Sequence, residues 1–241
     1  MTSAAHTALL DTASKPYRSA GRFAFHFARG KLRGDPVFRG ILQRGLLQSR
    51  SRILDLGCGQ GLLTAWLRAA CSIHDAGLWP QEWPTPPRPQ SIAGIELKHA
   101  DVQRARRALG GDCGVVQGDI RQHSYGDADA VVILDVLHYM NDAAQREVLR
   151  RVRSILPVGG LLLLRIGDAE GGMRFRYSQW VDQTIMLLRG HAWVRTFCRS
   201  LAAWQSLLAE NGFESHTIPM SEGTPFANVL LVATAVAAAS G

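Results

Sequence analysis

Short apolar runs alternate with helical patterns from Arg52 onward, which is typical of βα units on a parallel sheet. Five such runs predict strands over residues 53–56, 92–96, 114–117, 130–135 and 161–166. The fourth run is apolar up to its last residue, Asp135, and therefore suits the centre of a sheet. Two later runs, 213–219 and 226–233, flank turn-forming residues and predict an antiparallel hairpin. The pattern predicts an α/β fold with a seven-stranded, mostly parallel sheet that ends in this hairpin.

Helical spacing of apolar residues fills the intervals between the runs. The helix after the first run has its apolar positions at i, i+3, i+4 and i+7, namely Leu63, Trp66, Leu67 and Ala70. A later helix is expected to begin at Asp142, because Asp142 and Gln145 have the spacing of a capping box. Ser200 is expected to cap another helix, which ends at Asn211 and Gly212.

Three segments lie outside this alternation. Residues 1–50 predict an N-terminal cap of two helices, with Asp35 as a helix cap and Pro36 as the first residue of the second helix. Residues 51–241 form the main domain, with insertions at about 71–91 and 167–199. The first insertion holds a proline-rich stretch that reads as an extended loop. The second carries residues that could line a pocket or form its own core, namely Phe175, Tyr177, Trp180 and His191.

The composition excludes several classes of protein. The 241 residues are 46% hydrophobic and 20% charged, so the chain can bury a sizeable core and is not disordered. The longest apolar stretch, about 227–239, is shorter than the ~20 residues of a membrane helix. Residues 1–14 lack the basic start and apolar block of a secretory signal. The four cysteines are scattered, which disfavours a disulfide framework or a structural zinc site. We therefore expect a soluble, cytoplasmic protein.

The net charge of +7 is confined to one end of the chain. Residues 1–52 carry ten Lys or Arg and two Asp, a net of +8, whereas residues 53–241 carry seventeen and eighteen, a net of −1. Such asymmetry predicts that an acidic partner or substrate reaches the N-terminal end. A solvated basic face in an arginine-rich chain is the alternative.

The basic residues of this end follow helical spacing. Steps of 4, 4, 3 and 4 residues predict one continuous basic stripe on a single helix, formed by Arg18, Arg22, His26, Arg29 and Arg33. Phe23 and Phe27, with Ala20 and Gly30, form an apolar stripe beside it. We expect this apolar stripe to dock the helix over the carboxyl edge of the sheet, where open α/β folds bind ligands.

The strongest chemical signal is the segment Asp55-Leu-Gly-Cys-Gly-Gln-Gly61, between the first strand and its helix. Alternate glycines let a ligand approach the backbone closely, and the following helix offers free N–H groups. The spacing G-x-G-x-G differs from the G-x-G-x-x-G of dinucleotide sites, and the carboxylate of Asp55 suits a cationic ligand. The segment resembles the cofactor loop of class I S-adenosylmethionine-dependent methyltransferases. The resemblance extends from Arg52 to about Ala233.

This resemblance implies a Rossmann-like fold, S-adenosylmethionine as the methyl donor and S-adenosylhomocysteine as the product. Glu96 matches the acid that accepts both ribose hydroxyls, and Asp119, with the backbone of Ile120, matches the acid at the adenine. The implied cofactor residues are Asp55, Gly57, Cys58, Gly59, Gly61, Glu96, Leu97, Asp119, Ile120 and Asp135. The sequence lacks the acid cluster of metal-dependent catechol methyltransferases, so no metal is expected.

His138 is the candidate catalytic base, with Tyr139 beside it at the site. Methyl transfer is an in-line displacement, so the enzyme orients the two reactants and, for a phenol or activated carbon, removes a proton. Histidine can do this near neutral pH. A structural role, as a helix cap or packed on the cofactor, is the alternative. The candidate substrate residues are Tyr17, Arg18, Arg22, His26 and Tyr177.

The expected acceptor is a small organic molecule, either a hydroxylated aromatic or an acyl, lipid-like intermediate. An acidic acyl carrier protein could present it, since the basic N-terminal end would suit such a partner. Residues 15–18, 21–23, 27–32 and 223–228 also resemble a subgroup encoded with bacterial aryl-polyene pigment genes, which implies methylation of a hydroxylated aromatic head group.

Two other functions are kept open. The first is an RNA methyltransferase, which the basic end permits, although no RNA-binding module or base-methylation motif is recognisable. The second is a catalytically silent methyltransferase fold that acts as a scaffold, which the intact cofactor acids disfavour. The oligomeric state is open.

Overall fold

The computed structural model describes residues 3–167, 197–220 and 228–237. The chain divides into two compact units, one of residues 1–124 with 128–130 and the other of residues 125–127 with 131–241. The strands form a seven-stranded sheet in the order β3-β2-β1-β4-β5-β7-β6. Their bounds are β1 (Arg52–Leu56), β2 (Ser91–Glu96), β3 (Val115–Gln117), β4 (Ala130–Leu134), β5 (Leu161–Gly167), β6 (Phe213–Pro219) and β7 (Asn228–Ala235). The predicted α/β fold is confirmed.

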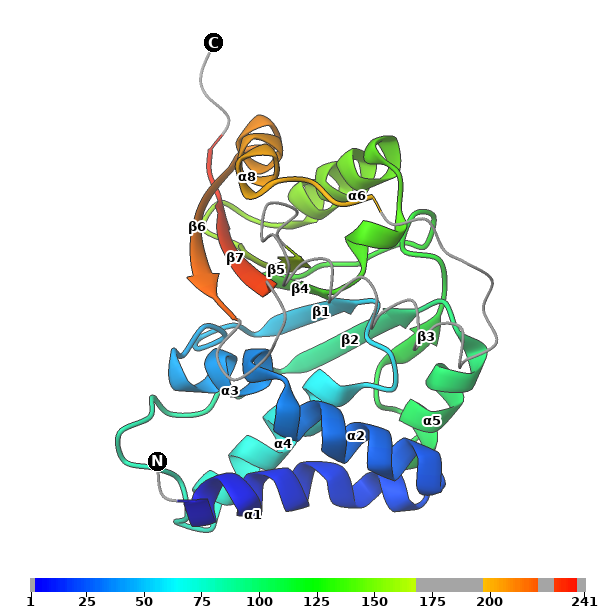
Figure 1. Cartoon of the computed structure of the whole chain (residues 1–241), viewed down its shortest axis with the longest axis vertical. Helices are drawn as coiled ribbons and strands as arrows, with labels where there is room; N and C mark the ends of the chain where they lie inside the picture. The colour runs from blue at the N-terminus through cyan, green and yellow to red at the C-terminus, as the bar shows by residue number, and fades with distance from the viewer. Residues whose placement is uncertain (1–2, 168–196, 221–227, 238–241) are drawn as a thin grey trace. The chain divides into compact units, whose positions relative to one another are not determined.

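The first unit holds parallel strands and most of the helices. β1 pairs in parallel with β2, and β2 with β3. The helices are α1 (Ser3–Ser14), η1 (Lys15–Arg18), α2 (Arg22–Gly34), α3 (Pro36–Gln43), α4 (Leu62–Asp75) and α5 (His99–Leu109). α1 packs along α4, and α2 lies beside both of them (Figure 1). The predicted apolar face of α4 is buried, with Trp66 fully enclosed.

The second unit holds the antiparallel end of the sheet. β7 pairs in antiparallel fashion with β5 on one side and β6 on the other, as the hairpin pattern predicted. Its helices are η2 (Leu137–Tyr139), α6 (Asp142–Ile155) and α8 (Leu201–Glu210), and α8 packs on β6. The core is formed by consecutive apolar residues of β5 and β7, which is why these strands show no alternation. The predicted turn after Pro219 and the insertion at 168–196 lie outside the described residues.

The N-terminal end corrects two expectations. It forms three α-helices and a 3₁₀ turn instead of two helices, because Gly21, with φ of +105°, separates η1 from α2. Arg18 therefore lies on a different element from Arg22, and the basic stripe is not continuous. The buried face of α2 is Ala24, Ala28 and Leu32, whereas the side chain of Phe23, predicted to dock the helix, is 54% exposed.

Helix caps confirm one prediction and correct another. The side chain of Asp35 accepts a hydrogen bond from Val37 N at the start of α3, with Pro36 as the first helical residue, as expected. At α6 the capping residue is Asn141 and not Asp142, since its side chain accepts from Ala144 N at 2.9 Å. The helix begins at Asp142 as predicted, but its cap is the preceding residue, and Gln145 is therefore outside a capping box.

The proline-rich loop of the first unit is held by one hydrogen bond within it and by two bonds from Gln48. Trp79 Nε1 donates to Pro84 O at 3.1 Å, and Gln48 Nε2 donates to both Thr85 O and Thr85 Oγ1. The ring of Trp83 is buried against this loop at 5.3 Å from that of Trp79. Within the described ranges, no helix has the length and apolar character needed to cross a membrane.

Candidate functional site

The glycine loop joins β1 to α4 in a backbone shape that favours glycine. Gly57, Gly59 and Gly61 have φ of +77°, +56° and +76°, in the left-handed region. Their surroundings differ. A Cβ on Gly61 would lie 2.8 Å from Leu109 Cδ1, so this glycine allows α5 to pack closely. Among the described residues, no atom lies within 4 Å of a Cβ built on Gly59, so these residues leave the backbone of Gly59 accessible to a ligand.

Glu96 contacts this loop from the carboxyl end of β2. Its side chain is buried, Oε2 accepts from Gly59 N at 2.9 Å, and Oε1 accepts from Lys98 N at 2.8 Å. Each carboxylate oxygen has a second lone pair, so both can accept a further hydrogen bond from a ligand hydroxyl. Leu97, the next predicted residue, presents an apolar side chain that is 62% exposed. The structure therefore brings Gly59 and Glu96 together.

Asp55 lies buried at the end of β1. Burial, and then the charge of Glu96, raise its pKa to about 7. Two carboxylates in a poorly solvated region favour a cation beside them, because a positive charge offsets both burial and mutual repulsion. Cys58 is also buried, and burial together with Asp55 and Glu96 raises the pKa of its thiol. Cys58 is therefore a neutral packing residue of the loop.

Asp119 follows β3 and is tied to a residue that the sequence analysis did not identify. Its Oδ1 accepts from Arg121 N at 2.9 Å, and the Arg121 guanidinium donates to both carboxylate oxygens. The carboxylate is partly exposed, whereas Ile120 is buried. Arg121 therefore already occupies part of the hydrogen-bonding capacity of Asp119.

In the second unit, Asp135 follows β4 with a positive φ of +59°. Its carboxylate forms an ion pair with Arg165 of β5, in which Arg165 Nε donates to Asp135 Oδ1 at 2.8 Å and Nη2 donates to Oδ2. Sequence reasoning missed Arg165, which stands in the apolar run 161–166. A single arginine in such a run is the available signal, because a buried guanidinium requires an acidic partner.

His138 lies in the same unit, on η2. Its Nε2 is buried, and none of the residues that the structure describes forms a hydrogen bond with it. Burial is the main cause that lowers the pKa of His138; Asp135 opposes this effect and Arg165 adds to it. The centroids of the His138 and Tyr139 rings are 4.1 Å apart. The imidazole is therefore neutral near pH 7 and can accept a proton.

The predicted substrate residues of the N-terminal end differ in exposure. Tyr17 is fully buried and its hydroxyl donates to Gln60 O at 2.8 Å, so it contacts the glycine loop and has no surface for a substrate. Gln60 Nε2 donates in turn to Ala24 O at 3.3 Å. The N-terminal end thus reaches the loop through residues other than the predicted apolar stripe.

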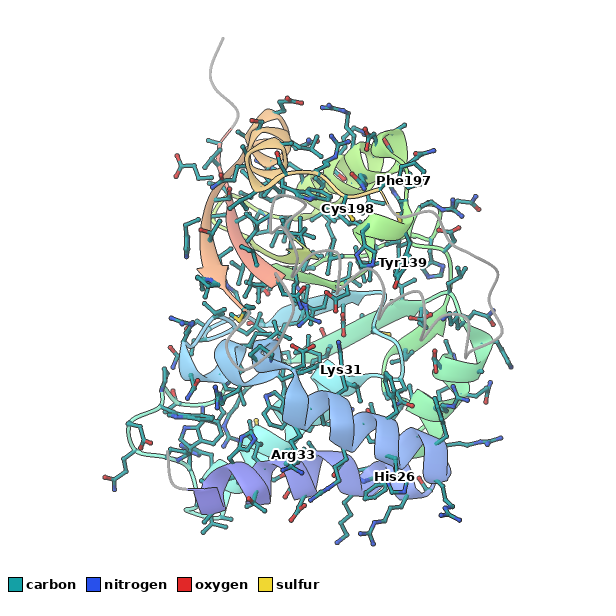
Figure 2. The ribbon with its side chains drawn as sticks, viewed as in Figure 1. His26, Lys31, Arg33, Tyr139, Phe197 and Cys198 are labelled. Carbon is teal, nitrogen blue, oxygen red and sulfur yellow. The ribbon has the colours of Figure 1, made fainter. Side chains whose placement is uncertain are left out.

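The remaining candidates of this end are exposed. Arg22 and His26 lie on the solvent face of α2, where Figure 2 labels His26, and Arg18 stacks on the ring of Phe25 at 5.0 Å. Arg29 pairs with Asp11 on α1. Tyr177 lies outside the described residues. In the part of the chain that the structure describes, no three His, Cys, Asp or Glu side chains are grouped as metal ligands.

Comparison with known sequences gives one family and a few relatives. A family model described as a methyltransferase domain matches residues 26–218. A phenazine O-methyltransferase, PhzM, of Lysobacter antibioticus is 29% identical over 174 residues, which cover 71% of this chain and 46% of the relative. A carboxy-S-adenosyl-L-methionine synthase of Chromohalobacter salexigens is 28% identical over 130 residues, which cover 52% of this chain and 43% of that protein. The chain thus spans less than half the length of these curated relatives.

Solved structures share the fold. The magnesium protoporphyrin IX methyltransferase ChlM of Synechocystis PCC 6803, solved with bound SAH, matches with a TM-score of 0.57 and 18% identity, covering 98% of this chain and all of that one. The O-methyltransferase NcsB1 from neocarzinostatin biosynthesis, solved with SAH and 1,4-dihydroxy-2-naphthoic acid, has a TM-score of 0.56 and 23% identity, covering 94% and 60%.

Proposed function

This chain belongs to the methyltransferase-domain family, and from that premise we propose that it transfers the methyl group of S-adenosylmethionine to a small organic acceptor. One observation carries the proposal: buried Glu96 holds the glycine loop through Gly59 N while its remaining lone pairs stay available. A carboxylate in that position can accept two hydroxyls of one ribose.

The charge of the first unit fits the same ligand. S-adenosylmethionine supplies a methyl group on a positively charged sulfur and becomes S-adenosylhomocysteine when it loses that group. Two buried acids lie at the glycine loop: Asp55 stands at its start, and Glu96 accepts from Gly59 N. Burial and the charge of Glu96 raise the pKa of Asp55. A cationic ligand would lower that pKa again and so bind with the acid ionised. The described residues leave the backbone of Gly59 accessible to it.

The second unit supplies the candidate base. His138 Nε2 takes the proton of an acceptor hydroxyl, the acceptor oxygen forms its bond to the methyl carbon, and the electrons of the carbon–sulfur bond remain on sulfur. A neutral imidazole is required for this role, and burial keeps His138 neutral. The role of the protein is otherwise to orient the reactants.

We propose a hydroxylated aromatic or an acyl, lipid-like intermediate as the acceptor. The relative named a phenazine O-methyltransferase and the structure of NcsB1 with a dihydroxynaphthoic acid both support an aromatic hydroxyl. The resemblance to the aryl-polyene subgroup supports the same chemistry. Exposed Arg22, His26 and Arg33 on α2 are compatible with a carrier protein that is acidic.

The test begins with the cofactor. Titration calorimetry should show binding of S-adenosylmethionine and S-adenosylhomocysteine to the purified protein. Glu96→Gln should weaken binding by about tenfold or more, because the amide keeps one accepting oxygen and its NH2 group must face the N–H of either Gly59 or Lys98. Glu82→Gln, at an exposed acid of the proline-rich loop, is the matched control and should leave binding unchanged. Absence of binding by the wild-type protein would overturn the proposal and favour a scaffold.

The class of the acceptor can be identified by tracing the labelled methyl group of S-adenosylmethionine into its product. Protein, S-adenosylmethionine with a labelled methyl group and lysate of the source cells are incubated, and the products are separated into organic-soluble, carrier-bound and nuclease-sensitive pools. Label in the first two pools, the second released by mild alkali, supports the proposed acceptor class. Label that is lost on nuclease treatment makes RNA the acceptor instead.

A second candidate is synthesis of carboxy-S-adenosylmethionine, which the match to the synthase of Chromohalobacter salexigens favours. The two activities differ in the fate of the nucleoside. Methyl transfer leaves S-adenosylhomocysteine, whereas the synthase product retains the labelled methyl carbon on the nucleoside. Mass spectrometry of the nucleoside fraction separates the two outcomes.

A further inference from the structure

Gln145 is a polar side chain with no exposed surface, located in the first turn of α6. Its Nε2 lies within hydrogen-bond distance of three carbonyl oxygens, at 3.1 Å from Leu137 O and 2.9 Å from both Met140 O and Phe197 O. An amide nitrogen has two hydrogens, so three acceptors share them. A buried amide satisfied in this way ties together the groups around it, since loss of the side chain would remove three hydrogen bonds at once.

These carbonyls belong to two segments that are distant in the sequence. Leu137 and Met140 bracket the η2 turn that carries His138, and Phe197 begins the segment that leads into α8. Phe197 N donates back to His138 O at 2.8 Å. Tyr139 and Phe197, labelled in Figure 2, come from these two segments. The backbone on both sides of His138 is therefore held by one side chain and one returning amide.

Arg199 completes the arrangement from the second segment. Its Nε donates to Gln145 Oε1 at 2.7 Å, and its guanidinium lies 3.0 Å from the Asp142 carboxylate. It also lies 5.8 Å from the centre of the Trp204 ring. The guanidinium has further donors in a rigid plane, so it orients the amide and decides which end of Gln145 faces the three carbonyls.

A helix-capping role for Gln145 does not explain this geometry. In a capping box the side-chain oxygen accepts from the backbone at the start of the helix. Here Oε1 accepts from Arg199, and Asn141 caps the helix without it. The amide is directed at the turn that contains His138 instead.

We propose that Gln145 and Arg199 are positioning residues for His138. They hold the η2 turn against residues 197–199, so that the imidazole Nε2 stays shielded from water and keeps a lone pair for the proton of the acceptor. The inference rests on the proposed function in taking His138 as the base. It adds that residues on both sides of the 168–196 segment share the positioning of that base.

The direct test observes His138 without any acceptor. Protein with ¹³C-labelled histidine is titrated by NMR, and His138→Gln identifies the His138 signal. Of the residues that the structure describes, the titratable and charged groups that act on this ring are Asp135, Arg165 and Tyr139. Wild-type His138 should titrate below the ordinary range. In Gln145→Leu the turn loosens, water reaches the ring, and the pKa of His138 should rise toward its ordinary value.

Arg199 supplies variants that keep Gln145 in place. Arg199→Met should raise the pKa of His138 by less than Gln145→Leu does. In Arg199→Lys the pKa of His138 should lie between those of Arg199→Met and wild type, because an ammonium group can still donate to Gln145 Oε1. These variants keep the test decisive if Gln145→Leu fails to fold. Arg146→Ala is the matched control on α6, since Arg146 is exposed and pairs with Glu210 at the surface.

Catalysis gives a second readout. Transfer of label from S-adenosylmethionine into the lysate pool should fall about tenfold to a hundredfold in Gln145→Leu, with affinity for S-adenosylmethionine unchanged by calorimetry. A folded Gln145→Leu protein with wild-type His138 titration and wild-type transfer would overturn the inference. Failure of the wild-type protein to bind S-adenosylmethionine would overturn the proposed function alone, because the NMR titration still reports whether Gln145 holds His138.

Discussion

Asp135 and Arg165 form an ion pair whose two members differ in exposure. The Arg165 side chain is 1% exposed, whereas that of Asp135 is 33% exposed. Water can therefore solvate the carboxylate when the guanidinium is removed, but it cannot reach the guanidinium when the carboxylate is removed. Removal of the carboxylate should therefore cost more stability than removal of the guanidinium.

This asymmetry predicts unequal effects of two substitutions on stability. Asp135→Asn leaves a buried cation without its acidic partner and should lower the free energy of unfolding by about 3 kcal/mol or more. Arg165→Met fills a similar volume and should cost about 1–2 kcal/mol. Asparagine tolerates the positive φ of residue 135, so backbone strain does not confuse the comparison. Urea unfolding measures both.

The control for this pair is the exposed pair of Arg150 and Glu147 on α6. Arg150→Met should change the free energy of unfolding by less than about 0.5 kcal/mol. Equal costs for Asp135→Asn and Arg165→Met would contradict the argument from exposure.

The raised pKa of Asp55 predicts how stability depends on pH. Its pKa is about 7 in the folded protein against 3.8 as the reference, so the folded state binds the proton more tightly. The stabilisation from Asp55 is fully present below the reference pKa and is lost as the pH rises toward 7. Asp55→Asn removes this dependence. Its unfolding free energy relative to wild type should increase by at most ~1.4 kcal/mol per pH unit between pH 4 and 7.

S-adenosylmethionine should oppose this trend. A cationic ligand stabilises the ionised Asp55, so thermal stabilisation by the ligand at pH 8 should be larger in wild type than in Asp55→Asn. Urea unfolding from pH 4 to 8 and thermal melts with the ligand provide the two measurements. The unfolding free energy of Glu82→Gln, at an exposed acid, should equal that of wild type at every pH. If the unfolding free energy of Asp55→Asn changes with pH in the same way as that of wild type, the raised pKa of Asp55 is refuted.

The contact between Tyr17 and Gln60 predicts that the N-terminal end supports the glycine loop. Tyr17→Phe removes only the hydroxyl that donates to Gln60 O and leaves a buried carbonyl without this bond. We expect a loss of about 1–2 kcal/mol in unfolding free energy and a several-fold weaker affinity for S-adenosylmethionine. Phe23→Leu, at the exposed ring of α2, is the control. Calorimetry that finds identical affinities for Tyr17→Phe and wild type would show that the loop is independent of this bond.

His138 predicts a separation of binding from turnover. His138→Gln should lower methyl transfer by ~10²-fold or more while the affinity for S-adenosylmethionine stays near that of wild type. Because the pKa of His138 is lowered, the rate should begin to decline only at a pH below the range in which an ordinary histidine titrates. Tyr139→Phe keeps the neighbouring ring and provides the comparison. Undiminished transfer by His138→Gln would remove His138 from the mechanism.

The elements that could be predicted are those with local signals. The apolar runs of the strands, the glycines of the loop after β1 and the Asp35–Pro36 cap depend on residues close in sequence, and the structure has them where expected. The break at Gly21 was also a local signal, but the regular spacing of basic residues concealed it. The burial of Ala24 and Ala28 on α2, in place of the phenylalanines, depends on close helix packing that hydrophobicity alone does not predict.

The residues that sequence reasoning missed are those whose role depends on distant partners. The role of Arg165 depends on its ion pair with Asp135, and that of Gln145 depends on Phe197 and Arg199 as well as on the carbonyls around η2. Neither pairing has a local signal in the sequence, because 30 positions separate Asp135 from Arg165 and 52 separate Gln145 from Phe197. Side chains that join separate segments are therefore the part of a site that requires a structure.

The bond from Tyr17 to Gln60 also has a consequence for the order in which the protein is made. The two residues are 43 positions apart, and α1 packs along α4, which follows Gln60. The helices α1 and α2 are synthesised before α4, so the surface that buries them is made after them. Until α4 emerges, Tyr17, Ala24 and Leu32 are exposed on a short basic segment. Translation therefore presents these apolar residues to the chaperones before the rest of the first unit can cover them.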